Sequence, residues 1–242
     1  MKKNSKLTNQ NLVLGMLDNV PFDGWNWEAI YKSVEELNNN NKKLDENEKN
    51  EVRSFFKNDL IETIKIFNDY LDEKMLEKFI KSKHFNKNTP EKIKHLILYR
   101  LHSGLEHKES IRSSIGLMSL PQNSKKSLLM LYKTCDKIWR ASGDESTDFS
   151  FYTKRIILSG VYTSTLLFWI NDESNGLKNT ENFLDRRLKD VSKIGKFKDF
   201  GKKILNKDQK LAKLPFELMS SISKKVDSVN LRKLINNFKY FK

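Results

Sequence analysis

The fold is decided by the stretch Gly143-Asp-Glu-Ser-Thr-Asp148-Phe-Ser-Phe-Tyr152-Thr-Lys-Arg155, which continues as Ile156-Ile-Leu-Ser-Gly-Val-Tyr-Thr-Ser-Thr-Leu-Leu-Phe-Trp-Ile-Asn171. A turn that carries acids opens a helix, and two cations lie in its first turns. The residues from 156 to 171 carry no charge. Apolar residues lie all the way round this helix, which is typical of a helix buried on most sides. The stretch therefore predicts a central helix over 149–171.

The rest of the chain has the same helical character. Apolar residues recur at three- and four-residue spacing between short polar breaks, and no segment alternates convincingly with period two. Ser124 and Asp148 are expected helix caps, and Gly143 and Gly176 suit helix ends. The pattern predicts an all-α protein with helices at 6–19, 25–38, 45–56, 57–83, 90–107, 109–119, 124–142, 149–171, 179–194, 197–213 and 216–240.

The charge of the chain is concentrated at its C-terminal end. The 242 residues have a net charge of +14, and residues 189–242 hold 15 Lys/Arg against 5 Asp/Glu, a net of +10. The change near Lys189 predicts a boundary between a compact bundle and a basic tail. Together with the helix pattern, it gives three segments: a three-helix segment over 1–56, a bundle over 57–189 and a basic amphipathic tail over 190–242.

Groups for catalysis or for metal binding are missing from the sequence. The one cysteine, Cys135, excludes an internal disulfide and is expected to be a buried structural residue. No histidine follows a Glu by three residues, no Gly-rich phosphate loop occurs, and no Gly-x-Ser-x-Gly elbow occurs. His102 and Glu106 could share a helix face, with a satisfied pair favoured over a ligand pair. Asp144 and its acidic neighbours favour a solvated helix start over a paired acid and base. We expect no enzyme activity, no metal and no cofactor.

Three short helices over 6–56 followed by a larger bundle is the layout of TetR-type repressors, in which the second and third helices form a helix-turn-helix. Here the third helix, 44–56, carries four acids against Lys49 and Arg53. Phosphate contacts supply most of the affinity for DNA, so this surface is expected to repel it. The sequence therefore predicts a vestigial helix-turn-helix and no nucleic-acid partner.

The uncharged central helix has two possible roles. It is either a plain core helix or one wall of an apolar cavity, because cavity walls mix apolar bulk with a few small or polar residues. The pair Ser159 and Gly160 is interpreted as small residues that allow close helix packing. The candidate lipid-binding residues are Ile157, Gly160, Val161, Ser164, Leu167 and Leu131.

The basic tail has bulky apolar residues recurring among lysines. This pattern suits a helix that lies in an anionic membrane interface, where each lysine contributes roughly 1 kcal/mol. The alternative is a solvated helix that packs on the bundle. The candidate membrane residues are Phe197, Lys202, Lys203, Ile204 and Leu205. The N-terminal residues lack an apolar run of signal-peptide length, so a cytoplasmic location is expected, with contact to a membrane surface.

Several motifs at fixed spacing resemble a known family, the accessory lipid-binding proteins of ubiquinone biosynthesis, ninth in the yeast Coq series. The likeness is close over 115–190 and looser over 10–110. The matching elements are Leu120-Pro-Gln-Asn123, Trp139, Gly143-Asp-Glu-Ser-Thr-Asp148, Phe151-Tyr-Thr-Lys-Arg155 and Thr180-Glu-Asn-Phe183-Leu-Asp-Arg-Arg187. The family usually has Trp where this chain has Phe151, which keeps an aromatic anchor and loses the indole donor.

The resemblance implies a TetR-like fold that binds an isoprenoid quinone or phospholipid and supports the di-iron hydroxylase of ubiquinone synthesis. It also implies a homodimer, peripheral on the inner face of the inner membrane, and a C-terminal helix that docks on anionic membrane. The partner-binding residues carried over from it are Asp148, Phe151, Tyr152, Thr153 and Arg155. Two competing interpretations remain, a TetR-like transcriptional regulator with a small-molecule pocket and a pure scaffold with a filled core.

Overall fold

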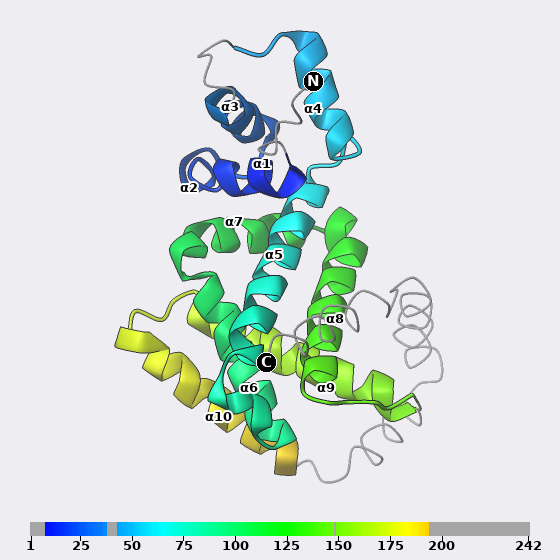
Figure 1. Ribbon diagram of the computed structural model, residues 1–242, viewed down its shortest axis with the longest axis vertical. Coiled ribbons are helices and arrows are strands. Elements are labelled where there is room, and N and C mark those ends of the chain that lie inside the picture. Colours follow the sequence, from blue (N-terminus) through cyan, green and yellow to red (C-terminus); the bar gives the residue numbers. More distant parts are fainter. Residues whose placement is uncertain (1–7, 38–42, 148, 194–242) are drawn as a thin grey trace. The chain divides into compact units, whose positions relative to one another are not determined.

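The computed structural model describes residues 8–37, 43–147 and 149–193 (Figure 1). Within these ranges every regular element is a helix, which confirms the predicted all-α fold class. The α-helices are α1 (Asn9–Met16), α2 (Val20–Asp23), α3 (Trp27–Leu37), α4 (Glu46–Phe55), α5 (Ile61–Ile80), α6 (Thr89–Ser103), α7 (Lys108–Met118), α8 (Ser124–Ala141), α9 (Phe149–Trp169) and α10 (Lys178–Lys193). Short 3-10 turns lie between them: η1 (Lys83–Asn86), η2 (Leu105–His107), η3 (Pro121–Asn123) and η4 (Asn175–Leu177).

The predicted helix 6–19 is wrong in extent. The Thr8 hydroxyl accepts a hydrogen bond from the Asn11 amide at 3.1 Å and so caps α1, which ends at Met16. Residues 17–19 form a turn, in which the Leu17 amide donates to the Leu14 carbonyl at 3.2 Å and the Asn19 amide donates to the Met16 carbonyl at 3.0 Å. The chain then begins α2, with Pro21 in its first turn.

The helix-end predictions have mixed outcomes. Gly143 follows α8 with a φ of +97°, a conformation that favours glycine, as expected of a residue just past a helix. Gly176 has a φ of +66° but lies in η4, before α10, and so does not end α9. Ser124 is the first residue of α8. Asp148 and the predicted helices 197–213 and 216–240 lie outside the described residues.

The described residues form two compact units. The first unit contains residues 8–37, 43–83 and 96–130, and the second contains 84–95, 131–147 and 149–193. These units differ from the expected segments 1–56 and 57–189, since α1 packs on α5 as well as α3, and α2 packs on α7. Almost all of the expected tail, 190–242, lies outside the described residues.

The first unit is held together by an apolar interior and a few buried polar contacts. Trp25 is buried, and its indole N–H donates to the Ser110 carbonyl at 2.9 Å, which joins α7 to the N-terminal helices. Arg100 on α6 forms a buried ion pair with Asp72 on α5 at 2.6 Å and also bonds to the Asn68 side chain at 2.5 Å. Burial of these charges is tolerated because each is paired and hydrogen-bonded.

The second unit is built around α9. Leu158, Val161 and Trp169 on this helix are buried, as the uncharged sequence predicted. On α8, Cys135 is fully buried, which confirms the prediction of a structural cysteine. None of the helices in the described part of the chain is both long enough and apolar enough to cross a membrane.

The motif around Thr180 and Phe183 attaches α10 to its neighbours. The Phe183 ring stacks on Phe168 of α9, with ring centroids 4.5 Å apart and an interplanar angle of 11°. The Thr180 hydroxyl donates to the Asp172 carboxylate at 2.5 Å, just beyond the end of α9. Lys94 on α6 forms ion pairs with both Glu181 and Asp185 on α10. These contacts give the C-terminal part of the family motif a structural role.

Candidate functional site

The turn between α8 and α9 folds Asp144 back against these two helices. The Asp144 amide donates to the Trp139 carbonyl at 3.0 Å, and Gly143 supplies the positive φ that this closure needs. The Asp144 side chain is 4% exposed and bonds to Lys154 at 2.6 Å and to Ser146 at 2.8 Å. The interpretation of Asp144 as part of a solvated helix start is therefore wrong, because its carboxylate is buried and bonded to cations.

Arg155 lies at the centre of a buried ionic cluster. Its Nε donates to Asp136 on α8 at 2.6 Å, and its Nη1 donates to Asp144 at 3.1 Å. Asp136 also accepts from Arg140 at 2.7 Å. Burial alone would raise the pKa of Asp144, but hydrogen bonds from Lys154, Ser146 and Arg155 outweigh burial and hold this pKa below its usual value. Both carboxylates are thus paired with cations.

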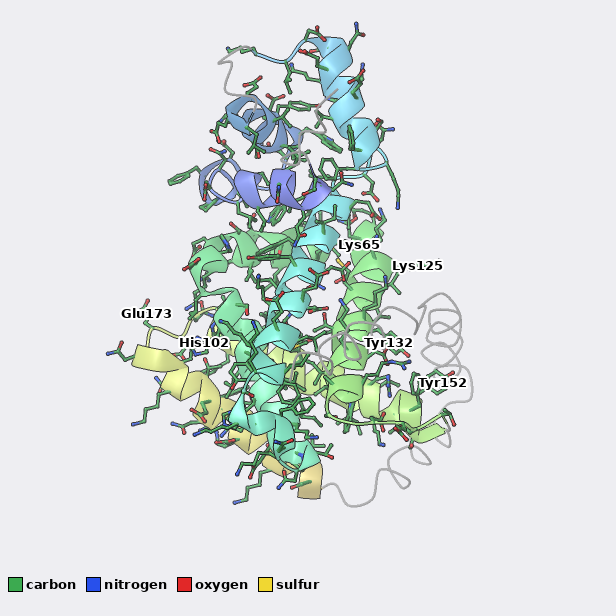
Figure 2. The ribbon with its side chains drawn as sticks, viewed as in Figure 1. Lys65, His102, Lys125, Tyr132, Tyr152 and Glu173 are labelled. Carbon is green, nitrogen blue, oxygen red and sulfur yellow. The ribbon has the colours of Figure 1, made fainter. Side chains whose placement is uncertain are left out.

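An aromatic patch lies next to this ionic cluster. We define it as Phe151, Tyr152 and Trp139, whose side chains are all half-buried. The Phe151 and Tyr152 rings meet edge to face, with centroids 5.1 Å apart and an interplanar angle of 81°. The Trp139 indole N–H donates to the Lys154 carbonyl at 3.0 Å, and the Lys154 ammonium lies 5.4 Å from the Trp139 ring centroid. Tyr152 lies near the N-terminal end of α9, as Figure 2 shows.

The structure separates the predicted partner-binding residues into surface and interior. Phe151 and Tyr152 retain partial exposure, whereas Thr153 is 4% exposed and Arg155 is fully buried. Asp148 lies outside the described residues. Phe151 and Tyr152 are thus accessible to a partner, whereas Arg155 is buried and contacts Phe151 through its guanidinium.

The predicted lipid-binding residues do not share one environment. Gly160 and Leu167 are exposed, Leu167 to 50%, and Ile157 and Ser164 are half-buried. These four residues recur at three- and four-residue spacing, so they lie on one face of α9, which we call the open face. Of the remaining candidates, Val161 is buried and Leu131 on α8 is half-buried.

Gly160 does not provide close helix packing, contrary to the sequence interpretation. A Cβ atom added at this position would meet nothing within 4 Å. The glycine therefore lies on open surface, which fits its place on the open face. Ser159 instead bonds back to the Arg155 carbonyl at 2.7 Å within α9.

Two residues of the site were missed in the sequence. Asp136 is an acid inside the largely apolar pattern of α8, and this mismatch was the one available signal. Tyr132, labelled in Figure 2, lies one turn earlier on α8 and is 1% exposed. Burial is the larger cause and the charge of Asp136 the smaller cause that raise the pKa of its hydroxyl.

The helix-turn-helix-like helices turn their cations inward. The Arg53 guanidinium on α4 lies 5.9 Å from the Trp27 ring centroid and donates to the Tyr31 hydroxyl. Lys49 lies 5.6 Å from the Tyr31 ring centroid and pairs with Glu46 at 3.0 Å. Asp45, Glu46 and Glu51 are exposed. The surface that would meet DNA is therefore more acidic than the composition of α4 suggested.

The histidine pattern offers no metal centre in the part of the chain that the structure describes. His102 is exposed on α6, and that helix ends at Ser103, so Glu106 in η2 does not share its helical face. Across 8–37, 43–147 and 149–193 there is no group of three or more His, Cys, Asp or Glu side chains that could hold a metal ion.

Comparison with known proteins shows which sequences and structures this chain is similar to. The COQ9 family model matches residues 124–195, which contain α8, α9 and α10. The ubiquinone biosynthesis protein COQ9 of Rattus norvegicus is 29% identical over 193 residues, covering 76% of this chain and 58% of that protein. The corresponding Xenopus tropicalis protein is 33% identical over 109 residues, covering 45% of this chain and 34% of that protein. The chain is thus similar to COQ9 proteins over part of its length.

The aligned part amounts to little more than half of the mitochondrial COQ9 protein of the rat. The matched region nevertheless contains the whole aromatic patch, the ionic cluster and the open face. A TetR transcriptional regulator from Nitrosomonas europaea has a similar structure, with a TM-score of 0.57 and 19% identity over 76% of this chain and 97% of the regulator. The chain thus has the predicted TetR-like fold.

Proposed function

We propose that this chain is a non-catalytic accessory protein of ubiquinone biosynthesis. The process is taken from its relatives, which are named as ubiquinone biosynthesis proteins. The absence of a catalytic role is supported by the ionic cluster, in which Asp136 and Asp144 form ion pairs with Arg140, Lys154 and Arg155. The observation that carries the proposal is the aromatic patch, because it is partly exposed and lies inside the region that matches COQ9.

The proposed ligand is an isoprenoid quinone or a phospholipid, bound along the open face of α9. The four residues of this face carry no charge, and Leu167 leaves half of its surface in water. Exposed apolar surface of this kind favours a greasy ligand or partner. The small residues Gly160 and Ser164 would let an isoprenoid chain approach the helix backbone.

The proposed protein partner is the di-iron hydroxylase of the same pathway, and the docking surface is the aromatic patch. Aromatic residues are enriched in the parts of interfaces that contribute most binding energy. Presentation of the lipid would follow from geometry, since Phe151 and Tyr152 of the patch lie on α9, the helix that also carries the open face.

The protein is proposed to act as a homodimer on the inner face of the inner membrane. The support for membrane contact is the net charge of +10 over residues 189–242. The candidate membrane residues Phe197, Lys202, Lys203, Ile204 and Leu205 lie outside the described residues.

Mass spectrometry of organic extracts from the purified protein tests the lipid claim. We expect an isoprenoid quinone or a phospholipid in the extract, and less of it from Leu167→Glu, which places a charge on the open face. Leu105→Glu is the matched control, because Leu105 is also exposed, to 38%, but lies in the first unit. Extracts that hold no such lipid, with no retention of quinone analogues, would sink the claim.

Binding of the purified hydroxylase tests the docking claim. Tyr152→Ala should weaken binding by roughly tenfold or more, since truncation of an aromatic hot spot costs about 2 kcal/mol. Tyr70→Ala, a half-buried tyrosine on α5 of the first unit, should leave binding unchanged. Equal binding by both variants and the wild type would argue against this surface.

Liposome flotation and sedimentation test the membrane and dimer claims. Flotation should require anionic lipid and weaken with salt, because exposed charges are screened. Deletion of residues 190–242 should abolish it, and equal flotation after the deletion would count against the tail. Sedimentation equilibrium should give twice the chain mass of 28.5 kDa.

The alternative function is a TetR-like transcriptional regulator. It is disfavoured because both cations of α4 lie against the rings of α3. A gel shift at low salt decides between the two, since specific retardation of operator-length DNA would favour the regulator.

A further inference from the structure

Asp136, on α8, lies outside the sequence motifs that mark the site, yet it holds the residue beneath the aromatic patch. Its Oδ1 accepts from Arg155 Nε at 2.6 Å, and its Oδ2 accepts from Arg140 Nε at 2.7 Å. The Asp136 side chain is 6% exposed and the Arg155 side chain 1%. Charge-assisted hydrogen bonds in such a dry environment are short and directional, so the Arg155 guanidinium has little freedom.

Arg155 in turn fixes Phe151 in two ways. Its Nη1 donates to the Phe151 carbonyl at 2.9 Å, and its guanidinium carbon lies 3.4 Å from the Phe151 ring centroid. A planar guanidinium stacks on an aromatic face in this manner, whereas an ammonium group does not. The Phe151 ring then meets the Tyr152 ring edge to face. A chain of contacts therefore runs from a buried carboxylate to the partly exposed aromatic surface.

We infer that Asp136 is a positioning residue for the aromatic patch, because it holds Arg155 in the arrangement that fixes the Phe151 ring. The consequence for partner binding rests on the proposed function, but the positioning itself does not. A preset surface loses less side-chain entropy on binding, so removal of Asp136 should weaken binding without deleting any residue of the patch.

The first unit contains a matched control. Asp72 is fully buried and pairs with Arg100 at 2.6 Å, the same distance and the same residue types as Asp136 with Arg155. Replacement of either aspartate removes one charged partner from a buried arginine. Both Asp72→Asn and Asp136→Asn should therefore lower the melting temperature. Only Asp136→Asn should disturb the patch.

Fluorine NMR of the full chain measures positioning without any partner. A fluorinated phenylalanine placed at position 151 alone should give a dispersed resonance in the wild type. In Asp136→Asn the resonance should move towards the value of the unfolded chain, and in Asp72→Asn it should stay in place. An unmoved resonance in Asp136→Asn, or an equal movement in both variants, would overturn the inference.

Arg155→Lys provides a second variant in case Asp136→Asn does not fold. Lysine keeps the charge that faces Asp136 and removes the plane that covers Phe151. The same resonance should therefore move, and an unchanged resonance would also overturn the inference.

Hydroxylase affinity is the last measurement. Asp136→Asn should weaken binding roughly tenfold, against less than about twofold for Asp72→Asn. Equal weakening in the two variants would mean that Asp136 acts only through stability. If the wild type does not bind the hydroxylase, the proposed function fails, and the fluorine resonance still decides whether Asp136 positions the patch.

Discussion

Arg100 and Arg155 are the same kind of residue in the two units, a buried arginine paired with an aspartate at 2.6 Å. Arg100 donates hydrogen bonds to two residues of α5, Asp72 and Asn68, and it bonds to both the side chain and the carbonyl of Asn68. Arg155 bonds to Asp136 and Asp144 and lays its guanidinium against Phe151. The pair of Arg100 with Asp72 joins α6 to α5 in the interior. The pair of Arg155 with Asp136 also contacts Phe151, which is partly exposed.

The difference shows that a buried ion pair does not by itself mark a functional site. Replacement of buried ion pairs by apolar residues is often neutral or stabilising. A contribution to stability therefore does not by itself explain why either position holds an arginine. What distinguishes Arg155 is the half-buried ring on its other side. Arg155 is part of the motif on which the family resemblance rests, and its contacts are with Asp136, Asp144 and Phe151.

The largest expected effect comes from removal of each arginine. Arg100→Ala should lower the free energy of unfolding by about 3–5 kcal/mol, because it removes the arginine that is paired with the fully buried Asp72. Arg155→Ala should cost less, since Asp136 keeps its ion pair with Arg140 and Asp144 keeps its ion pair with Lys154. Urea denaturation measures both, with the exposed Arg112→Ala as the control, at less than about 1 kcal/mol. A larger loss for Arg155→Ala would break the comparison.

A pair of glycines sharpens the comparison at smaller scale. A Cβ at Gly15 in the first unit would collide with the Ser33 hydroxyl, so Gly15→Ala should destabilise the chain by about 1–3 kcal/mol. A Cβ at Gly160 on the open face meets nothing, and Gly160→Ala should stabilise α9 by roughly 0.5–1 kcal/mol. Thermal unfolding of the two variants decides. Destabilisation by Gly160→Ala would show that a second molecule covers the open face in solution.

A pH-dependent effect is expected at Asp172, whose carboxylate accepts hydrogen bonds from Thr180 near the start of α10. Burial alone would raise the pKa of Asp172, but hydrogen bonds from Thr180 and Ser174 outweigh it and lower this pKa to about 2. The ionised carboxylate therefore contributes stability that is fully present above about pH 4 and is lost as the pH falls towards 2. Asp172→Ala should cost about 1 kcal/mol at pH 7 and progressively less below pH 4. A cost in urea denaturation that does not change with pH would contradict the assignment.

Much of the fold could be predicted from the sequence, since the helices follow from apolar spacing. The central helix, the buried Cys135 and the acidic character of α4 were all visible before the structure. The four-residue helix α2 was missed because so short a segment shows no helical period, and the predicted helix 6–19 extended three residues beyond the end of α1 at Met16.

The site was less predictable, because the spacing of apolar residues indicates which helix face is buried. It does not indicate which charged side chains form ion pairs. Asp136 and Arg155 are 19 positions apart on different helices, and nothing local pairs them. The same limit hid the burial of Asp144, which looks like a solvated acid until the Gly143 turn folds it back. Gly160 was misread for the opposite reason, since a small residue is equally consistent with close packing and with open surface.

The ion pairs of Lys94 with α10 have a consequence for synthesis of the chain. Lys94 meets Asp185, a residue 91 positions later, and the whole first unit is complete by residue 130. At ribosomal rates of about 5–20 residues per second, the segment 84–95 waits roughly 5–20 s for its partner helix. During that interval the apolar side chains of this segment lack their final cover. We expect this early fragment to be the part of the nascent chain that chaperones hold longest.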